Sequence, residues 1–150
     1  EVVEVAAPEP ALELARRNAA ANDPANITFE NTDVFRYLSD LVASGRKFDV
    51  MVLDPPKFAR NRAAVPEALK GYRRLHQLAL KLLDRDGVLV SCCCTGLITM
   101  TDLEELIGQV AVEARRDLQL LERRGAAPDH PVAVTCRETG YLKCILSRVL

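Results

Sequence analysis

The sequence has little of what would place it in a membrane or attach the whole chain to nucleic acid. It has no tryptophan, only 5% aromatic residues, and 20 basic residues against 21 acidic ones. No apolar run approaches the ~18 residues that a membrane span needs, which argues against a transmembrane role. Because basic and acidic residues are nearly equal in number, the chain as a whole lacks a strong positive electrostatic field that would attract nucleic acid. An RNA or DNA substrate would therefore be held by local patches or by segments beyond this sequence.

Disulfide and metal chemistry also find little support. There are five cysteines, an odd number, and the first residues lack the pattern of a secretory leader. We therefore expect reduced thiols and a cytoplasmic location. Cys92, Cys93 and Cys94 are adjacent, whereas zinc ligands are usually separated by two to four residues, so no metal site is expected.

What is present is an ordinary globular composition. The 150 residues are 49% hydrophobic and 27% charged, which fits one domain over 1–150 and not a disordered chain. The sequence begins with Glu1 before an apolar run instead of a methionine with a polar start. We expect it to be part of a longer protein.

Strand and helix patterns alternate along the chain at the spacing of β-α-β units. Phe48–Leu53 is almost continuously apolar, as expected of a strand buried on both faces. We predict an open, mostly parallel α/β sheet. The expected strands are 2–6, 26–31, 48–53, 88–93, 118–121 and 141–146, with 132–135 as a further short candidate; the expected helices are 9–22, 33–44, 66–83 and 101–115.

In such sheets ligands bind beyond the carboxyl ends of the strands. That rule selects four segments, 6–9, 32–34, 54–58 and 92–96. Within 32–34, Asp33 can accept a hydrogen bond from an exocyclic amine while Val34 packs on the ring. The structural alternative is that Asp33 only caps the helix that follows it.

The segment Asp54-Pro55-Pro56 is more distinctive. Two prolines stiffen the loop and remove two backbone donors, so a carboxylate is held rigidly at the rim of the sheet. The alternative interpretation is a rigid turn with a solvated aspartate.

Cys94 lies where a strand ends, before Thr95-Gly96. A thiol in that place can be partly exposed and can serve as a nucleophile. Strand alternation places Cys92 and Cys94 on one face and Cys93 on the other. The structural alternative for these three, and our expectation for Cys136 and Cys144, is a small buried hydrophobic residue.

Two histidines complete the set of candidate groups. His76 falls on an apolar helix face, which is typical of a packed core histidine. His130 lies in Pro128-Asp129-His130-Pro131, where it can orient a substrate or simply stabilise a turn.

Together these residues resemble a known family. Asp33-Val34-Phe35, FDVMVLDPPKFAR (48–60), Gly71-Tyr72-Arg73, SCCCTGLIT (91–99), APDHPV (127–132) and Tyr141-Leu142-Lys143 follow in that order. The chain resembles, from Val2 to its end, the class I S-adenosylmethionine-dependent methyltransferases of the RlmI type, which make 5-methylcytosine in large-subunit ribosomal RNA. The resemblance implies a Rossmann-like sheet with an antiparallel C-terminal strand.

The resemblance also implies roles for individual residues. Cys94 would attack C6 of the cytosine, and Asp54 would hydrogen-bond the ring at N3. The C5 carbon then takes the methyl group of S-adenosylmethionine, and loss of the C5 proton releases the cysteine. Cofactor binding would fall to Asp33, Val34, Asp54 and Pro55, and substrate binding to Pro56, Lys57, Phe58 and Arg60; Arg62 is a further candidate for phosphate contact.

Two departures from the family pattern bear on cofactor binding. The glycine-rich turn that follows the first strand in this family is not found before Val2, so that strand, the turn and the N-terminal RNA-binding region are expected upstream. The acidic residue that usually ends the second strand is replaced by Ala6, with Glu4 two residues earlier on the same face.

Three functions stay open at this point. The first is a ribosomal RNA cytosine-5 methyltransferase, and a homodimer is a possible oligomeric state of such an enzyme. The second is an amino-nitrogen methyltransferase, which usually has an aromatic residue directly after the acidic-Pro-Pro loop, where this chain has Lys57 and then Phe58. The third is a non-catalytic methyltransferase-like binding module, suggested by Ala6 and the missing turn.

Overall fold

A computed structural model describes residues 1–6, 8–23 and 26–150. The described part of the chain divides into two compact units, Glu1–Ser44 and Gly45–Leu150. None of its helices is long and apolar enough to cross a membrane. The single domain expected from the length remains a prediction, and each unit is considered by itself.

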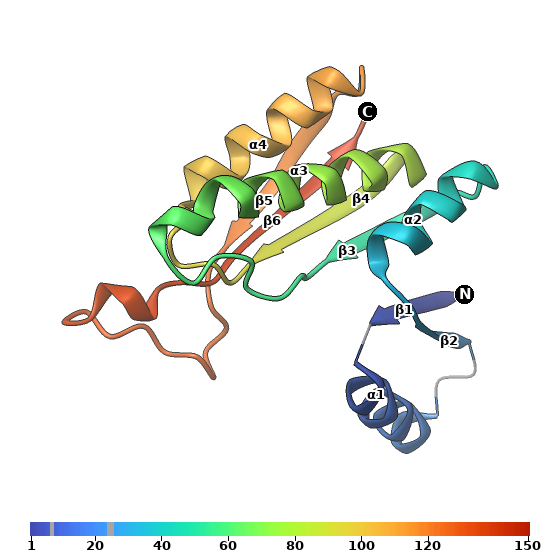
Figure 1. Cartoon of the computed structure of the whole chain (residues 1–150), viewed down its shortest axis with the longest axis horizontal. Helices are drawn as coiled ribbons and strands as arrows, with labels where there is room; N and C mark the ends of the chain where they lie inside the picture. Colours follow the sequence, from blue (N-terminus) through green and yellow to red (C-terminus); the bar gives the residue numbers. More distant parts are fainter. Residues whose placement is uncertain (7, 24–25) are drawn as a thin grey trace. The chain divides into compact units, whose positions relative to one another are not determined.

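The first unit is a β-α-β-α arrangement built on a two-stranded parallel sheet (Figure 1). Its elements are β1 (Val2–Ala6), α1 (Glu9–Asn22), β2 (Ile27–Asn31) and α2 (Val34–Ala43). These bounds confirm the four elements predicted for this stretch of sequence.

Local backbone chemistry sets the ends of these helices. The expected stop after α1 falls partly on Pro24, which lies outside the described residues, and Asp23 adopts a left-handed φ of 50°. The Asp33 carboxylate accepts a hydrogen bond from the Arg36 amide at 2.9 Å and caps α2. Gly45, with a φ of 71°, follows the last turn of α2, as glycine commonly does.

The second unit is a four-stranded sheet in the order β3-β4-β6-β5. Its strands are β3 (Phe48–Leu53), β4 (Leu83–Cys93), β5 (Leu118–Arg124) and β6 (Lys143–Val149), and its helices are α3 (Val65–Leu82) and α4 (Met100–Glu113), with short 3-10 turns at Arg62–Ala64 and Arg137–Thr139. β3 and β4 are parallel, and β6 runs antiparallel to both of its neighbours. The predicted mostly parallel sheet with an antiparallel C-terminal strand is confirmed.

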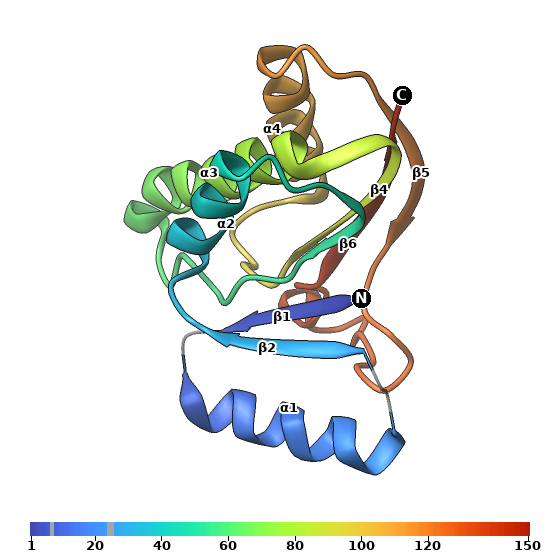
Figure 2. The same ribbon diagram turned by 90° about the vertical axis from the view of Figure 1, so that its right-hand side faces the viewer.

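Helices α3 and α4 pack on one face of this sheet (Figures 1 and 2). Leu89, Ser91 and Cys93 of β4 point to the helix-covered face and are buried, as are Lys143 and Ile145 of β6. Tyr72 of α3 and Val110 of α4 are fully buried. An apolar layer between two helices and one sheet face therefore forms the core of this unit.

The opposite face of β3 corrects one expectation. Val50 and Val52 are 56% and 63% exposed, whereas the apolar run had suggested burial on both faces. They pair in register with Val88 and Val90, on the face that α3 and α4 do not cover. Within its own sheet β3 is also an edge strand, which adds to the exposure.

β4 starts five residues earlier than the predicted strand 88–93. Helix α3 ends at Leu82 and β4 begins at once at Leu83. The Asp86-Gly87 pair, expected to be a turn before the strand, is an irregularity within it, where the register with β3 shifts and Asp86 has a φ of 66°. Turn-forming residues here make a bulge, since pairing with β3 continues on both sides.

Other boundaries also differ from the sequence-based expectations. Thr99, and not Thr101 or Asp102, caps α4: its hydroxyl accepts from the Asp102 amide at 3.1 Å, and Asp102 Oδ2 accepts from the Thr99 amide at 2.7 Å. The segment 132–135 is not a strand. The last strand is 143–149 instead of 141–146, because its partner β4 sets the pairing from Cys93↔Lys143 to Val88↔Arg148.

Candidate active site

The structure brings together two of the segments selected from the sequence. β3 and β4 are parallel neighbours, so Asp54-Pro55-Pro56 and Cys94-Thr95-Gly96 leave the sheet at the same edge. The Cys94 thiol lies 3.9 Å from the carbonyl oxygen of Pro55. The Cys94 thiol and the acidic proline loop therefore lie together at one edge of the sheet.

Comparison of the three adjacent cysteines selects Cys94 as the thiol at this rim. Cys93 is 1% exposed on the helix-covered face, and its sulfur lies 3.4 Å from the Tyr72 hydroxyl. Cys92 lies opposite Cys144 in the sheet. Burial, with Cys144 as the next cause, raises the pKa of Cys92 to about 12, so its reactive thiolate is scarce at neutral pH. The alternation predicted for Cys92 and Cys93 is confirmed.

Asp54 follows the last residue of β3 and is exposed to solvent, while Pro55 is half-buried. Its carboxylate charge is one of the causes that raise the pKa of Cys92, so it lies near the same strand end as the cysteines. Asp54 is therefore available to a ligand at this edge. The rigid turn and the functional carboxylate, which the sequence left as alternatives, are both consistent with this position.

Phe58, a predicted substrate-binding residue, packs inward. Its ring lies 4.8 Å from the Tyr72 ring, centroid to centroid. A Cβ atom on Gly71 would come within 3.1 Å of the Phe58 ring, so the glycine leaves the space that this packing needs. The contact ties the loop after β3 to helix α3 and fixes where Asp54-Pro55-Pro56 lies.

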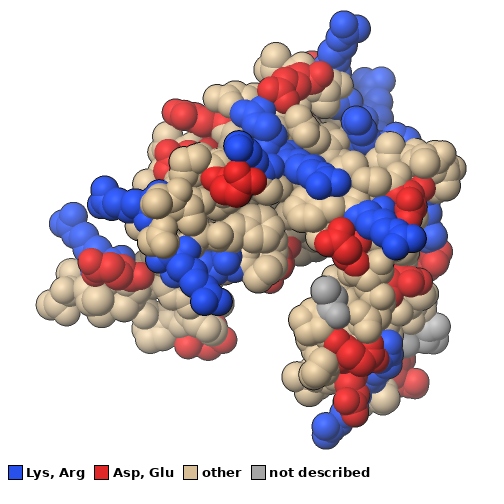
Figure 3. All heavy atoms as spheres, viewed as in Figure 1, with Lys and Arg blue, Asp and Glu red and all other residues tan. Residues whose placement is uncertain are grey.

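The basic residues of the same loop lie on the surface. Lys57, Arg60 and Arg62 are exposed, and Arg62 begins a short 3-10 turn capped by the Asn61 side chain. On the face seen in Figure 3, basic and acidic side chains are interspersed. Phosphate contact by Lys57 and Arg60 remains a prediction.

Asp33 and Val34, the predicted adenine-binding pair, belong to the unit Glu1–Ser44. Asp33 Oδ1 accepts a hydrogen bond from the Arg36 amide, so the helix-capping role of Asp33 is confirmed, and its adenine-binding role stays a prediction. A carboxylate has a second oxygen with free lone pairs, and Val34 occupies the first position of α2. These residues fit an amine-bearing ring such as adenine, whereas no carboxylate occupies position 6, where ribose hydroxyls would be bound.

Sequence reasoning missed a buried polar cluster behind Cys94. The Lys143 ammonium donates to the Thr95 carbonyl at 2.7 Å, and the Thr95 hydroxyl lies 3.0 Å from that of Tyr72. Thr95 and Tyr72 are fully buried, and Lys143 is 7% exposed. The available signal was a lysine within the strand pattern YLKCIL, at a position that alternates with apolar residues.

The two histidines differ in environment. His76 is 1% exposed, as predicted for a core histidine; its Nδ1 lies 2.7 Å from the Tyr72 carbonyl and its Nε2 2.9 Å from the Ser91 hydroxyl. His130 is exposed beside Asp129, with 3.2 Å between Nδ1 and Oδ1. It lines a small surface pocket with Pro131, Glu138, Thr139 and Tyr141.

Cys136 corrects a further expectation. It is exposed, with its sulfur 3.5 Å from a Glu138 carboxylate oxygen, and is not a small buried hydrophobic residue. The segment around it is a loop with a short 3-10 turn, which leaves the thiol exposed. Cys144, by contrast, is partly buried beside Cys92.

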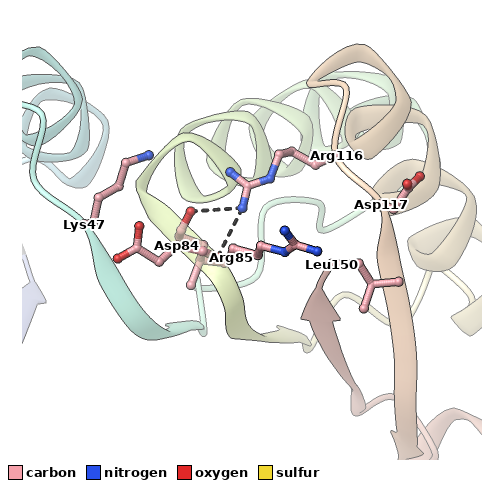
Figure 4. Close-up of a pocket in the computed structure, with 7 residues that line it drawn as sticks. Lys47, Asp84, Arg85, Arg116, Asp117 and Leu150 are labelled. Atoms are coloured by element: carbon pink, nitrogen blue, oxygen red, sulfur yellow. Dashed lines mark hydrogen bonds between the residues drawn. The ribbon is translucent and has the colours of Figure 1, made fainter.

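A cavity of about 480 Å³ lies at the other end of the sheet, where β3, β4 and β5 begin (Figure 4). Arg116 extends into it and donates to the backbone carbonyls of Leu80, Leu83 and Asp84 at 3.1–3.3 Å. Its guanidinium thus joins the end of α3 to the start of β4. Ligands of parallel sheets bind at the opposite edge, so this cavity is not the candidate site.

Comparison with known proteins gives consistent results. No family model matches the chain. It is 41% identical over its whole length to Ribosomal RNA large subunit methyltransferase I of Tolumonas auensis and 40% identical to the protein of the same name from Escherichia coli, and it spans 38% of each. A solved methyltransferase complexed with SAH superposes on 98% of the chain with a TM-score of 0.82 at 23% identity, and 38% of that structure is covered.

Proposed function

Because the chain is homologous over its whole length to the proteins named Ribosomal RNA large subunit methyltransferase I and has the fold of class I methyltransferases, we propose that it is the catalytic part of an S-adenosylmethionine-dependent RNA methyltransferase. The proposed target is C5 of a cytosine in large-subunit ribosomal RNA. The observation that carries the proposal is the shared rim of Cys94 and the Asp54-Pro55-Pro56 loop. The cytoplasmic location expected from the cysteines is part of this proposal.

The proposed chemistry starts from the low nucleophilicity of cytosine C5. Attack of the Cys94 thiolate on C6 breaks the aromatic system and makes C5 nucleophilic. As the thiolate adds, N3 takes up a proton from solvent, and the Asp54 carboxylate would accept a hydrogen bond from the resulting N3–H. C5 then takes the methyl group and passes its proton to water. The C6–S bond breaks and N3 returns its proton to solvent, which restores both the ring and the thiolate. A target base must leave any stack to reach these groups.

When bound, S-adenosylmethionine supplies the electrophilic methyl group. This chain's part would be to hold the adenine through Asp33 and Val34 and to shape the methyl-transfer pocket with Pro55 and Pro56. Ala6 offers no hydrogen bond where the family has an acid, so we expect weak cofactor binding by residues 1–150 taken alone.

The alternative of amino-nitrogen methylation is less well supported by the packing of the loop. That chemistry usually has an aromatic ring directly after the acidic-Pro-Pro segment. Here Lys57 takes that place, and the Phe58 ring packs on Tyr72. The cysteine mechanism uses a thiol that the amino-nitrogen reaction would leave without a role.

The test compares matched cysteine variants in the full-length gene product. Cys94→Ala is expected to reduce formation of 5-methylcytosine in large-subunit ribosomal RNA by at least about a hundredfold, since covalent catalysis is lost. It should also abolish the covalent complex with RNA that contains 5-fluorocytosine. Cys92→Ala is the matched control, because Cys92 lies two residues before Cys94 in the chain, and it should stay within about tenfold of the unmodified protein.

Two results would overturn the proposal. One is wild-type formation of 5-methylcytosine by Cys94→Ala. The other is a methyl group mapped by nucleoside mass spectrometry to an exocyclic nitrogen. A protein that binds RNA but transfers no methyl group would favour the non-catalytic module instead.

A further inference from the structure

Lys143 lies in an unusual place for a lysine. It is the first residue of β6, opposite Cys93 in the sheet, and it points to the face covered by α3 and α4. Only 7% of its surface is exposed. Its ammonium donates to the carbonyl oxygen of Thr95 at 2.7 Å, directly after Cys94 in the chain. A buried cation therefore holds the backbone that carries the candidate nucleophile.

The groups around Lys143 come from three elements. Cys93 lies across from it on β4, Cys94 follows that strand, Asp102 is in the first turn of α4, and Tyr72 of α3 contacts both Cys93 and Thr95. Burial lowers the pKa of Lys143, and the charges of Cys93, Cys94 and Asp102 act in the opposite direction. Hydrogen bonds from Thr99 lower the pKa of Asp102, so this carboxylate stays ionised and favours the charged ammonium.

Burial of the Lys143 charge carries a free-energy cost. Burying an ammonium is expensive unless it is paired and hydrogen-bonded. A neutral residue would pack against Tyr72 and the sheet without that cost. The hydrogen bond to Thr95 instead places this charge one residue from Cys94, a thiol whose reaction requires the anion.

We propose that Lys143 is a positioning residue for Cys94: its ammonium fixes the Cys94-Thr95 backbone through the Thr95 carbonyl, and its positive charge favours the Cys94 thiolate. The role in methyl transfer rests on the proposed function above. The effect on the thiol does not, because it is measured without RNA or cofactor.

The experiment follows alkylation of each cysteine by iodoacetamide between pH 6 and 10, with peptide mass spectrometry to separate the five thiols. Lys143→Gln removes the charge and keeps an N–H donor on a side chain that is one bond shorter. We expect Cys94 to react roughly threefold to tenfold more slowly at pH 7.5, with its pH profile moved to higher pH. Lys143→Arg keeps the charge and should restore a profile close to that of the unmodified chain.

Controls separate charge from packing. Exposed Cys136 is an internal standard whose rate should not change in either variant. Tyr72→Phe removes a hydroxyl from the same cluster without changing a charge, and should leave the Cys94 profile in place. Circular dichroism selects a temperature at which every variant is folded; if Lys143→Gln does not fold, Lys143→Met replaces it.

A Cys94 profile that is unchanged on loss of the charge would overturn the proposal. So would a profile that moves equally in Lys143→Arg and Lys143→Gln, because packing alone would then explain it. Failure of the cytosine-5 assignment would instead appear as absent 5-methylcytosine with the alkylation result intact, which keeps the two failures distinguishable.

Discussion

His76 shows at the scale of one residue how burial makes stability depend on pH. Its ring is 1% exposed, and its two nitrogens contact the Tyr72 carbonyl and the Ser91 hydroxyl. Burial lowers the pKa of His76 below its ordinary value of 6.5. Below pH 6.5 the unfolded chain takes up a proton that the folded chain excludes, so stability is present above that pH and is lost as the pH falls.

We therefore expect the free energy of unfolding to fall by at most about 1.4 kcal/mol from this residue between pH 7.5 and pH 5.5. His76→Gln should be less stable at pH 7.5 by about 1–3 kcal/mol because buried hydrogen bonds are lost. It should also show a flatter pH dependence. Urea unfolding at several pH values measures both effects.

The matched control is His130→Gln, since His130 is the other histidine of the sequence and is exposed. Its pH dependence should match that of the unmodified chain. If the pH dependence of the free energy of unfolding became flatter in both variants, or in neither, the assignment of the acid sensitivity to His76 would be contradicted.

At the scale of an element, the irregularity in β4 depends on a glycine. A Cβ atom at Gly87 would lie 3.0 Å from the Asp84 carbonyl oxygen and 3.3 Å from that of Asp49. These are backbone atoms that cannot rotate away. The bulge lets β4 continue from Leu83 directly after helix α3, so it determines where this strand begins.

Gly87→Ala is expected to lower the free energy of unfolding by about 1–3 kcal/mol, since the new methyl group meets the backbone of two strands. Gly108→Ala is the control, because a Cβ atom there has nothing within 4 Å in helix α4. That change should raise stability by up to about 1 kcal/mol. Urea unfolding of both variants measures the contrast, and a Gly87→Ala chain as stable as the unmodified one would contradict the steric argument.

At the scale of the whole molecule, the apolar core is distributed unevenly. Among the described residues of the unit Glu1–Ser44, Leu12 and Leu38 are the buried apolar side chains. The unit Gly45–Leu150 contains the rest of the core, including Tyr72, Leu89 and Val110. A two-stranded sheet with so little buried area is at best marginally stable by itself.

We predict that residues 45–150 fold without residues 1–44. The shorter chain should unfold cooperatively in urea, with a free energy within about 2 kcal/mol of the corresponding transition in the whole chain. Residues 1–44 alone should show no cooperative transition. Unfolding is monitored by circular dichroism and by the near-ultraviolet absorbance of Tyr72 and Tyr141. Loss of cooperativity in residues 45–150 would contradict this division.

Much of the fold was predictable because it depends on local rules. The period of apolar residues gave helix α1 with its observed bounds, and the Asp33 cap and Gly45 gave the ends of α2. Segment 132–135 has residues that favour a strand but pairs with no other described strand. The start of β4 was placed too late because Asp86-Gly87, which favours a turn, forms a bulge within the strand. In both cases pairing with a distant segment decided the outcome.

The sequence by itself determined the α/β class, the alternation of Cys92 and Cys93, and the two segments at the rim, since strand period and stiff proline loops are encoded locally. Only the tertiary structure decided which cysteine faces the Pro55 carbonyl, that Phe58 packs on Tyr72, and that Lys143 supports Thr95. These contacts join residues 14 to 48 positions apart. Their formation depends on the sheet order β3-β4-β6, which local patterns do not specify.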